Sequence, residues 1–169
     1  MNLSLPQVIA ADTNVGLDLA QADDWVLDAL ATIRRRLRGC SLLVPPTVLD
    51  ELGYLASYGE GARERKAAGE FLRHHRRWGF GLVNQVPPGV AHVGRIAECL
   101  RAEELLPSEE VNDSFILAES ACLGCSVLLT SDQHLRGIDH EHLGFVLSPF
   151  DVSVPILATP REIVRKFFR

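Results

Sequence analysis

Short, continuously apolar runs alternate along the chain with longer segments in which apolar residues recur every three to four positions. Runs such as Val8 to Ala11 and Ser41 to Val44 are typical of strands buried on both faces, whereas the periodic segments are typical of amphipathic helices. Strands that alternate with helices predict an α/β fold, with a parallel central sheet flanked by helices on both faces. The length of 169 residues suits one such domain, spanning residues 1–169.

The segment from Asn112 to Asp132 is predicted to form a helix, a turn and a strand, with an aspartate at each end. Its helical part, Asp113 to Leu123, and its strand part, Cys125 to Thr130, would each span roughly 16 Å. Because Gly124 reverses the chain between two legs of matched length, Asp113 and Asp132 are expected to lie close together at one edge of the sheet.

The same patterns predict the other elements. A loop is expected around Gly16, and the final helix carries a capping box in which Thr159 precedes Glu162 by three residues. Further helices are predicted near 23–38, 47–57, 63–78 and 93–100, short strands or extended segments near 80–86, 145–147 and 152–157, and loops at 56–61 and 133–142.

Four acids should gather at the carboxyl edge of this sheet, where ligands bind in open α/β folds. Asp12 follows the first strand, Asp113 begins a helix and Asp132 follows a strand. Glu51 lies on the apolar stripe of the helix after the second strand, whereas the neighbouring Asp50 points elsewhere. So much like charge is unfavourable without a cation. Oxygen ligands favour Mg²⁺ or Mn²⁺, which would equip the site for phosphoryl chemistry.

The motifs that carry these acids resemble, in order, the four acidic motifs of the PIN-domain ribonucleases. They are VIAADTN (8–14), PTVLDEL (46–52), NDSFILA (112–118) and LLTSD (128–132). The resemblance spans nearly the whole chain and implies a PIN-like, Rossmann-like fold and a Mg²⁺- or Mn²⁺-dependent endonuclease for single-stranded RNA. It also implies that Thr130 and Asn14 support the acids Asp12, Glu51, Asp113 and Asp132 by positioning water or orienting a carboxylate.

Many proteins of this family are toxins of toxin–antitoxin pairs, often dimeric, and others process or degrade cellular RNA. The resemblance therefore implies a possible antitoxin partner and a possible homodimer. The basic helical segment at about 57–90 is longer than is usual for the compact toxin type. A different class of function, a catalytically inactive PIN-like module that binds RNA or protein, is disfavoured by intact acids at all four positions.

Several polar residues outside the motifs are weaker candidates. Arg73, Arg76 and Arg77 lie beside Trp78 and could contact nucleic acid, or they could form a solvated helix face. Just beyond Asp132, His134 could reach a phosphate.

Two acidic clusters have competing interpretations. Glu109 and Glu110 most simply favour the helix N-terminus, although Glu110 lies one turn before Asp113 and could join the site as a fifth acid. The cluster from Asp139 to His142 could bind a metal, although a solvated loop is the simpler interpretation.

Composition narrows the class of protein. The net charge of −5 argues against coating of nucleic acid by bulk electrostatics, although it leaves room for local basic patches. We find no signal-like start and no apolar stretch of the roughly 18 residues that a membrane span needs, so a cytoplasmic protein without membrane contact is expected. Cys122 and Cys125 form a Cys-x-x-Cys pair, which we interpret as core packing because no second pair accompanies it.

Overall fold

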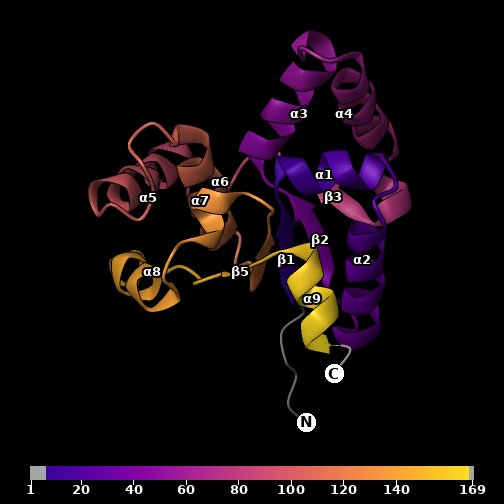
Figure 1. The fold of residues 1–169 in the computed structure, drawn as a ribbon. Helices are drawn as coiled ribbons and strands as arrows, with labels where there is room; N and C mark the ends of the chain where they lie inside the picture. The colour runs from indigo at the N-terminus through magenta and orange to yellow at the C-terminus, as the bar shows by residue number, and fades with distance from the viewer. Residues whose placement is uncertain (1–6, 168–169) are drawn as a thin grey trace.

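The computed structural model describes residues 7–167, in which five parallel strands form one sheet in the order β3-β2-β1-β4-β5 (Figure 1). Ile9, at the centre, pairs with Leu42 on one side and with Val127 on the other. The predicted parallel sheet is confirmed. The strands are β1 (Val8–Ala11), β2 (Ser41–Val44), β3 (Phe80–Leu82), β4 (Val127–Leu129) and β5 (Ile156–Ala158).

Helices cover both faces of the sheet, as the alternating pattern predicts. The helices of the described chain, where η marks a short 3₁₀ helix, are α1 (Thr13–Ala20), α2 (Asp24–Arg36), α3 (Pro46–Tyr58), α4 (Ala62–His74), η1 (His75–Trp78), α5 (Val90–Ala102), α6 (Val111–Cys122), α7 (Gln133–Arg136), α8 (His140–Leu147), η2 (Ser148–Phe150) and α9 (Pro160–Phe167). On one side α2 packs against α9, and on the other α5 packs against α6 and α8 (Figure 1). The antiparallel pair α3 and α4 forms a hairpin beyond the carboxyl ends of the strands.

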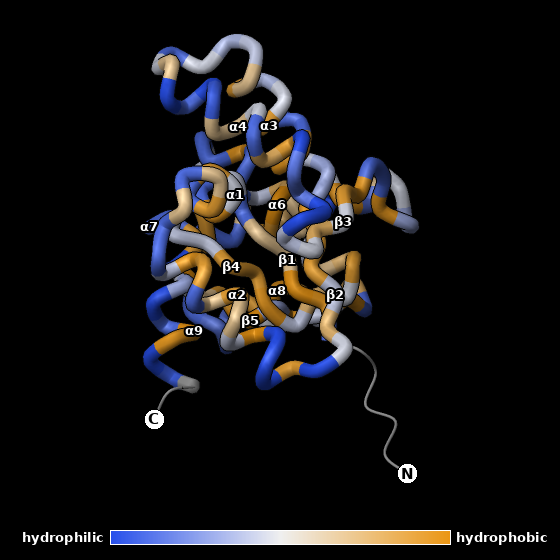
Figure 2. Tube along the Cα trace, turned by 90° about the vertical axis from the view of Figure 1, so that its right-hand side faces the viewer, coloured by the Kyte–Doolittle hydropathy of each residue, from blue (hydrophilic) through white to orange (hydrophobic). Residues whose placement is uncertain are grey.

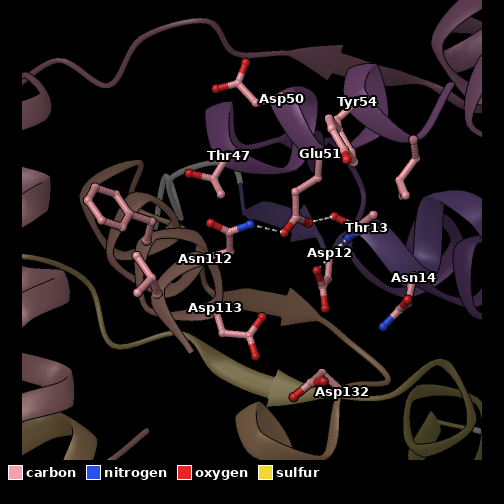
Figure 3. A pocket seen from close by; sticks show the side chains of 13 residues that line it. Asp12, Thr13, Asn14, Thr47, Asp50, Glu51, Tyr54, Asn112, Asp113 and Asp132 are labelled. Carbon is pink, nitrogen blue, oxygen red and sulfur yellow. Dashed lines mark hydrogen bonds between the residues drawn. The ribbon is translucent and has the colours of Figure 1, made fainter. Parts of the chain in front are cut away.

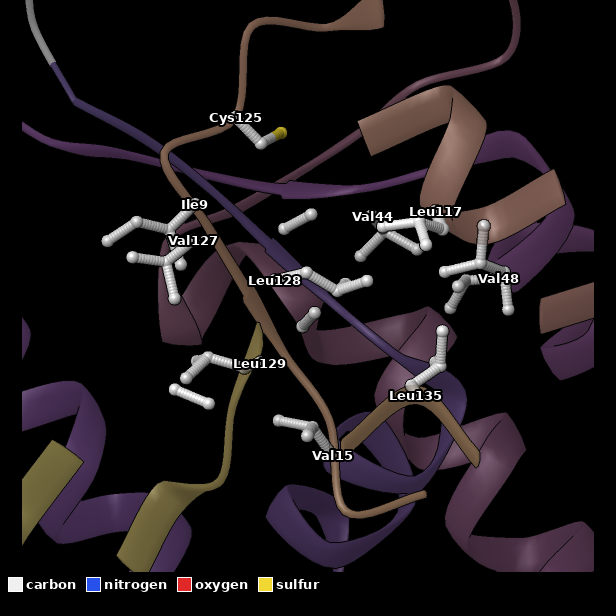
Figure 4. Packing of buried hydrophobic residues seen from close by; sticks show 14 of the residues in the cluster. Ile9, Val15, Val44, Val48, Leu117, Cys125, Val127, Leu128, Leu129 and Leu135 are labelled. Atoms are coloured by element: carbon white, nitrogen blue, oxygen red, sulfur yellow. The ribbon is translucent and has the colours of Figure 1, made fainter. Parts of the chain in front are cut away.

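The hydrophobic core lies between the strands and the helices that cover them (Figure 4). Figure 2 shows the most hydrophobic stretches on the central strands, with hydrophilic stretches on the outer helices. Ile9, Leu128 and Leu129 are fully buried. Cys125 is buried with them, and all four cysteines are free thiols. Burial raises the pKa of Cys125 to about 12, so it stays protonated and acts as a small apolar side chain.

The connections of the sheet create a topological switch point between β1 and β4. The chain passes from β1 outward through β2 to β3, and it then returns to the other side of β1 to form β4. Ligand sites in doubly wound sheets occur outside the carboxyl ends of the strands at such a point. Asp12 follows β1 here, and its amide donates to the carbonyl of Leu129 at 2.9 Å.

Two predicted loops are wrong. The chain around Gly16 belongs to α1, and residues 133–142 contain α7 and the start of α8. Both helices in the second segment begin at aspartates, since Asp132 and Asp139 accept hydrogen bonds from first-turn amides. These helices are too short for periodicity to reveal, and only the caps mark them.

Other boundaries differ from the prediction more modestly. Residues 145–147 lie in α8 and η2 begins at Ser148, so no strand forms there, and α3 continues to Tyr58. The capping box of α9 is confirmed by reciprocal bonds, from the Thr159 amide to Glu162 at 2.8 Å and from the Glu162 amide to Thr159 at 3.1 Å. Within residues 7–167, no helix has the length and apolar character needed to cross a membrane.

Candidate active site

A cavity of about 670 Å³ opens at the carboxyl ends of the central strands, between α3 and α6 (Figure 3). The carboxylates of Asp12, Glu51, Asp113 and Asp132 all line it. The predicted gathering of four acids from separate elements is therefore present in the structure. The remaining lining residues are Thr13, Asn14, Thr47, Asp50, Tyr54, Leu55, Val111, Asn112 and Phe115.

Asp12 is the most buried of these acids, at 4% exposure. Its Oδ1 accepts a hydrogen bond from the amide of Thr13 at 2.6 Å, which caps α1. Burial, together with the charges of Glu51 and Asp132, raises the pKa of Asp12 to about 6, although the hydrogen bonds from Thr130 and Thr13 oppose the rise. A carboxylate held this firmly has a fixed direction toward the cavity.

Thr130 links the two aspartates that flank the switch point. Its hydroxyl donates to Oδ2 of Asp12 at 2.7 Å and accepts from the amide of Asp132 at 3.0 Å. Thr130 is fully buried, so its bond to Asp12 forms away from water, whereas the bond from the Asp132 amide is partly buried. Thr130 thus contacts the acids that the sequence pairs it with.

Glu51 connects three helices. Its Oε2 accepts from the hydroxyl of Thr13 on α1, and its Oε1 accepts from Nδ2 of Asn112 on α6 at 2.7 Å. Figure 3 shows Glu51 pointing toward Asp12, whereas Asp50 points away from the other acids. The predicted distinction between Glu51 and Asp50 agrees with this geometry.

The acid at the start of α6 is only half-buried and faces several like charges. The pKa of Asp113 is raised to about 7, mainly by burial and also by the charges of Asp132, Asp12, Glu110 and Glu51. Across the cavity, Oδ1 of Asp132 accepts from the amides of His134 at 2.7 Å and Leu135 at 3.1 Å, which starts α7. Asp113, in the first turn of α6, and Asp132, after β4, face each other, as the matched lengths of the predicted helix and strand suggest (Figure 3).

One buried acid near the site was missed by the sequence analysis. Glu119 is 5% exposed, and its carboxylate accepts from both the amide and the hydroxyl of Thr47 at the start of α3. The N-cap of that helix, Pro45, makes no side-chain capping bond, so Glu119 supplies the cap from another helix. Burial raises the pKa of Glu119, while the bonds from Thr47 oppose the rise.

The weaker candidates have different positions. Nε2 of His134 lies 3.4 Å from Oε1 of Glu110, whose charge acts on Asp113, but neither His134 nor Glu110 lines the cavity. Arg73 lies 3.4 Å from Glu70 on the same helix, and neither Arg73 nor the two arginines of η1, Arg76 and Arg77, line the cavity.

The second cluster has a structural role in the described chain. Asp139 caps α8 through the amide of His142, at 2.8 Å, so this segment begins a helix and is not the solvated loop of the simpler interpretation.

Thr13 and Asn112 are the other functional candidates that the sequence analysis did not single out. Each is the immediate neighbour of a motif aspartate, Asp12 or Asp113, which is the signal that could have found them. Their common contact with Glu51 depends on three separate helices and is not encoded in local spacing.

The donor set fits a hard divalent cation, because the polar side chains that line the cavity are carboxylates, hydroxyls and amides, with no histidine or cysteine among them, and the carboxylates raise one another's pKa values. Among residues 7–167, however, no three His, Cys, Asp or Glu side chains form a ready-made cluster of metal ligands.

Among solved structures, the chain is similar to a crystal structure of VapBC2 from Rickettsia felis bound to a DNA fragment from its promoter. The TM-score is 0.60 at 13% sequence identity, with 90% of this chain and 98% of that chain covered. This similarity shows a shared fold, and the predicted three-layer α/β/α architecture is confirmed. No protein-family model matches the sequence, and neither does any curated protein.

Proposed function

We propose that this protein is a Mg²⁺- or Mn²⁺-dependent endoribonuclease that hydrolyses phosphodiester bonds of single-stranded RNA. The observation that carries the proposal is the convergence of Asp12, Glu51, Asp113 and Asp132 on one open cavity at the switch point of the sheet. The four acids come from separate elements, and the repulsion among their carboxylates destabilises the fold. Coincidence is therefore a poor explanation for this arrangement.

The chain's own residues would each have a defined part. Thr130 and the Thr13 amide fix the direction of the Asp12 carboxylate, and Glu51 is fixed by Thr13 and Asn112. Asn14 lines the same cavity, where its amide could orient water or the substrate. A divalent cation bound among the acids would supply hydroxide near neutral pH and stabilise charge developing on the phosphate.

The contribution of Asp113 follows from its unusual environment. It is half-buried among like charges and has a raised pKa, so it gains most from a bound cation. Glu110 is one of the like charges that act on Asp113, and Nε2 of His134 lies 3.4 Å from Oε1 of Glu110, so His134 could contact a phosphate bound near Asp113.

The proposal is tested with purified protein and a labelled single-stranded RNA. Cleavage is expected with Mg²⁺ or Mn²⁺, and chelation or Asp132→Asn should abolish it, while Asp50→Asn should retain it. Metal-independent cleavage, or unchanged activity of Asp132→Asn, would contradict the mechanism. RNA binding without cleavage by the unaltered chain would instead identify a non-catalytic PIN-like module.

We further propose that the ribonuclease is the toxin of a toxin–antitoxin pair, with an antitoxin protein as partner and a homodimer as a possible assembly. The support is the fold that the chain shares with the VapBC2 structure. Expression should arrest growth, and the product of an adjoining small reading frame should relieve the arrest. Harmless expression of the active enzyme would favour a role in RNA processing or degradation.

A further inference from the structure

Two tyrosines on successive turns of α3 are unusually exposed. Tyr54 is 63% and Tyr58 is 72% exposed, and their ring centroids lie 5.4 Å apart with the planes tilted by 43°. Exposing large aromatic side chains to water is unfavourable in free energy, and two of them on one helix face form a local apolar surface. A surface of this kind is typical of a place where another molecule binds.

The tyrosine pair begins at the edge of the carboxylate cavity. Tyr54 lines that cavity and lies one turn after Glu51 on the same helix, so both side chains project on the same side of α3 (Figure 3). Tyr58 continues the surface by a further turn, toward the end of the α3–α4 hairpin (Figure 1). Any molecule that covers these rings therefore lies beside the acids.

A cation lies just past the second ring. The exposed guanidinium of Arg65, on α4, donates to the carbonyl of Gly59 at 2.6 Å and also to that of Glu60. Gly59 directly follows Tyr58, so the guanidinium of Arg65 is held by the carbonyls of the two residues that come immediately after the tyrosine pair. Acids at one end, aromatic rings in the middle and a cation at the other end match the backbone and bases of one nucleic-acid strand.

We propose that Tyr54 and Tyr58 form a stacking platform for an unpaired base next to the phosphodiester bond that is cleaved. The proposal rests on the proposed ribonuclease function and adds how the strand is held. An aromatic ring stacks on the π-face of any base, so the platform favours single-stranded RNA over duplex without reading a particular sequence. Arg65 would contact a phosphate on the side of the platform away from the acids.

The test measures binding separately from cleavage. All variants are made in the Asp132→Asn chain, and the affinity for a fluorescein-labelled single-stranded RNA of eight nucleotides is measured by fluorescence anisotropy. Tyr54→Ala and Tyr58→Ala should each weaken binding by about tenfold. Tyr54→Phe and Tyr58→Phe should retain it, because stacking needs the ring and not the hydroxyl.

A matched control uses Phe145, an equally exposed aromatic on α8. Phe145→Ala should bind RNA like the parent. Because all of the substituted residues are exposed, each variant should have a melting temperature within a few degrees of the parent value. RNAs carrying a single abasic ribose at each position locate the stacked base. When the abasic ribose is at the position of the stacked base, the parent should bind that RNA about tenfold more weakly than the intact RNA. The parent and Tyr58→Ala should bind this abasic RNA with equal affinity.

Unchanged RNA affinity in both alanine variants would overturn the platform. So would strictly additive losses from the alanine and abasic changes at every position, because stacking partners must couple. Alanine variants that retain RNA affinity but lose binding to an antitoxin chain would assign this face to a protein. Failure of the proposed function has a different signature, since an unaltered chain that binds RNA through these tyrosines but does not cleave it would keep the platform and remove the chemistry.

Discussion

Glu119 on α6 caps the first turn of α3 through Thr47, with Oε2 3.0 Å from the Thr47 amide and Oε1 2.8 Å from the Thr47 hydroxyl. These two helices carry Asp113 and Glu51 to opposite sides of the cavity. The capping bond therefore sets the separation of two site acids from outside the site itself. A negative charge at a helix N-terminus is also favourable for the helix dipole.

Removing this cap should destabilise the fold. We expect Glu119→Ala to lower the free energy of unfolding by about 1–3 kcal/mol, because two donors at the start of α3 lose their acceptor in a buried place. Urea denaturation measures the change. Glu98→Gln, at an exposed position of α5, is the control and should stay within about 0.5 kcal/mol of the parent. Equal stability of the two variants would show that the cap contributes nothing.

Replacing the hydroxyl of Thr130 should affect both stability and activity. Thr130→Val keeps the shape but leaves Oδ2 of Asp12 without its donor and the amide of Asp132 without its acceptor. We expect a loss of about 1.5–3 kcal/mol in the free energy of unfolding and a further rise in the pKa of Asp12. Thr130→Ser keeps the hydroxyl and should retain most cleavage. Comparable losses in Val and Ser variants would point to packing in place of hydrogen bonding.

Neighbouring acids on α3 should differ sharply in their contribution to cleavage. Glu51→Gln removes a charge that faces the cavity and places an amide NH₂ against the donors Thr13 and Asn112. A loss of roughly 100-fold or more in the cleavage rate is expected. Asp50→Asn, whose side chain points away, should stay within about twofold. Rates measured at saturating Mn²⁺ compare the two, and similar losses would reject Glu51 as the site acid.

The stability of the metal-free chain should fall as the pH rises from about 4 to 8. Asp12 and Asp113 have folded-state pKa values of about 6 and about 7, above the unfolded value of about 3.9. The folded state therefore binds more protons in this range, so the stabilisation is fully present below about pH 4 and is lost as the pH rises through 6 to 7. Melting temperatures in a chelator, from pH 5 to pH 8, measure the slope.

Asp113→Asn is the control for this pH dependence. The variant should show a shallower decline, so that its melting temperature exceeds that of the parent most clearly at pH 8. Added Mg²⁺ should raise the parent's melting temperature at pH 8 more than the variant's, because a cation relieves the repulsion that the variant has already reduced. Parallel curves for the two chains in the chelator would contradict the burial and repulsion at Asp113.

Much of the architecture was predictable because its signals are local. Continuous apolar runs identify β1 and β2, and the spacing between Asp113 and Asp132 predicts two legs of equal length. The short helices α1, α7 and α8 escaped prediction because each is at most eight residues long, so hydrophobic periodicity has too few turns to repeat. In α1 the central Gly16 also lowers helix propensity.

The sequence by itself determined which acids belong together, because chain order and the parallel sheet bring residues after β1 and β4 to one edge. Only the tertiary structure decided how they are held. The contacts of Glu51 with Thr13 and Asn112, and of Glu119 with Thr47, join side chains from different helices. Such contacts depend on the packing distance and rotation of whole helices, which no local pattern of residues encodes.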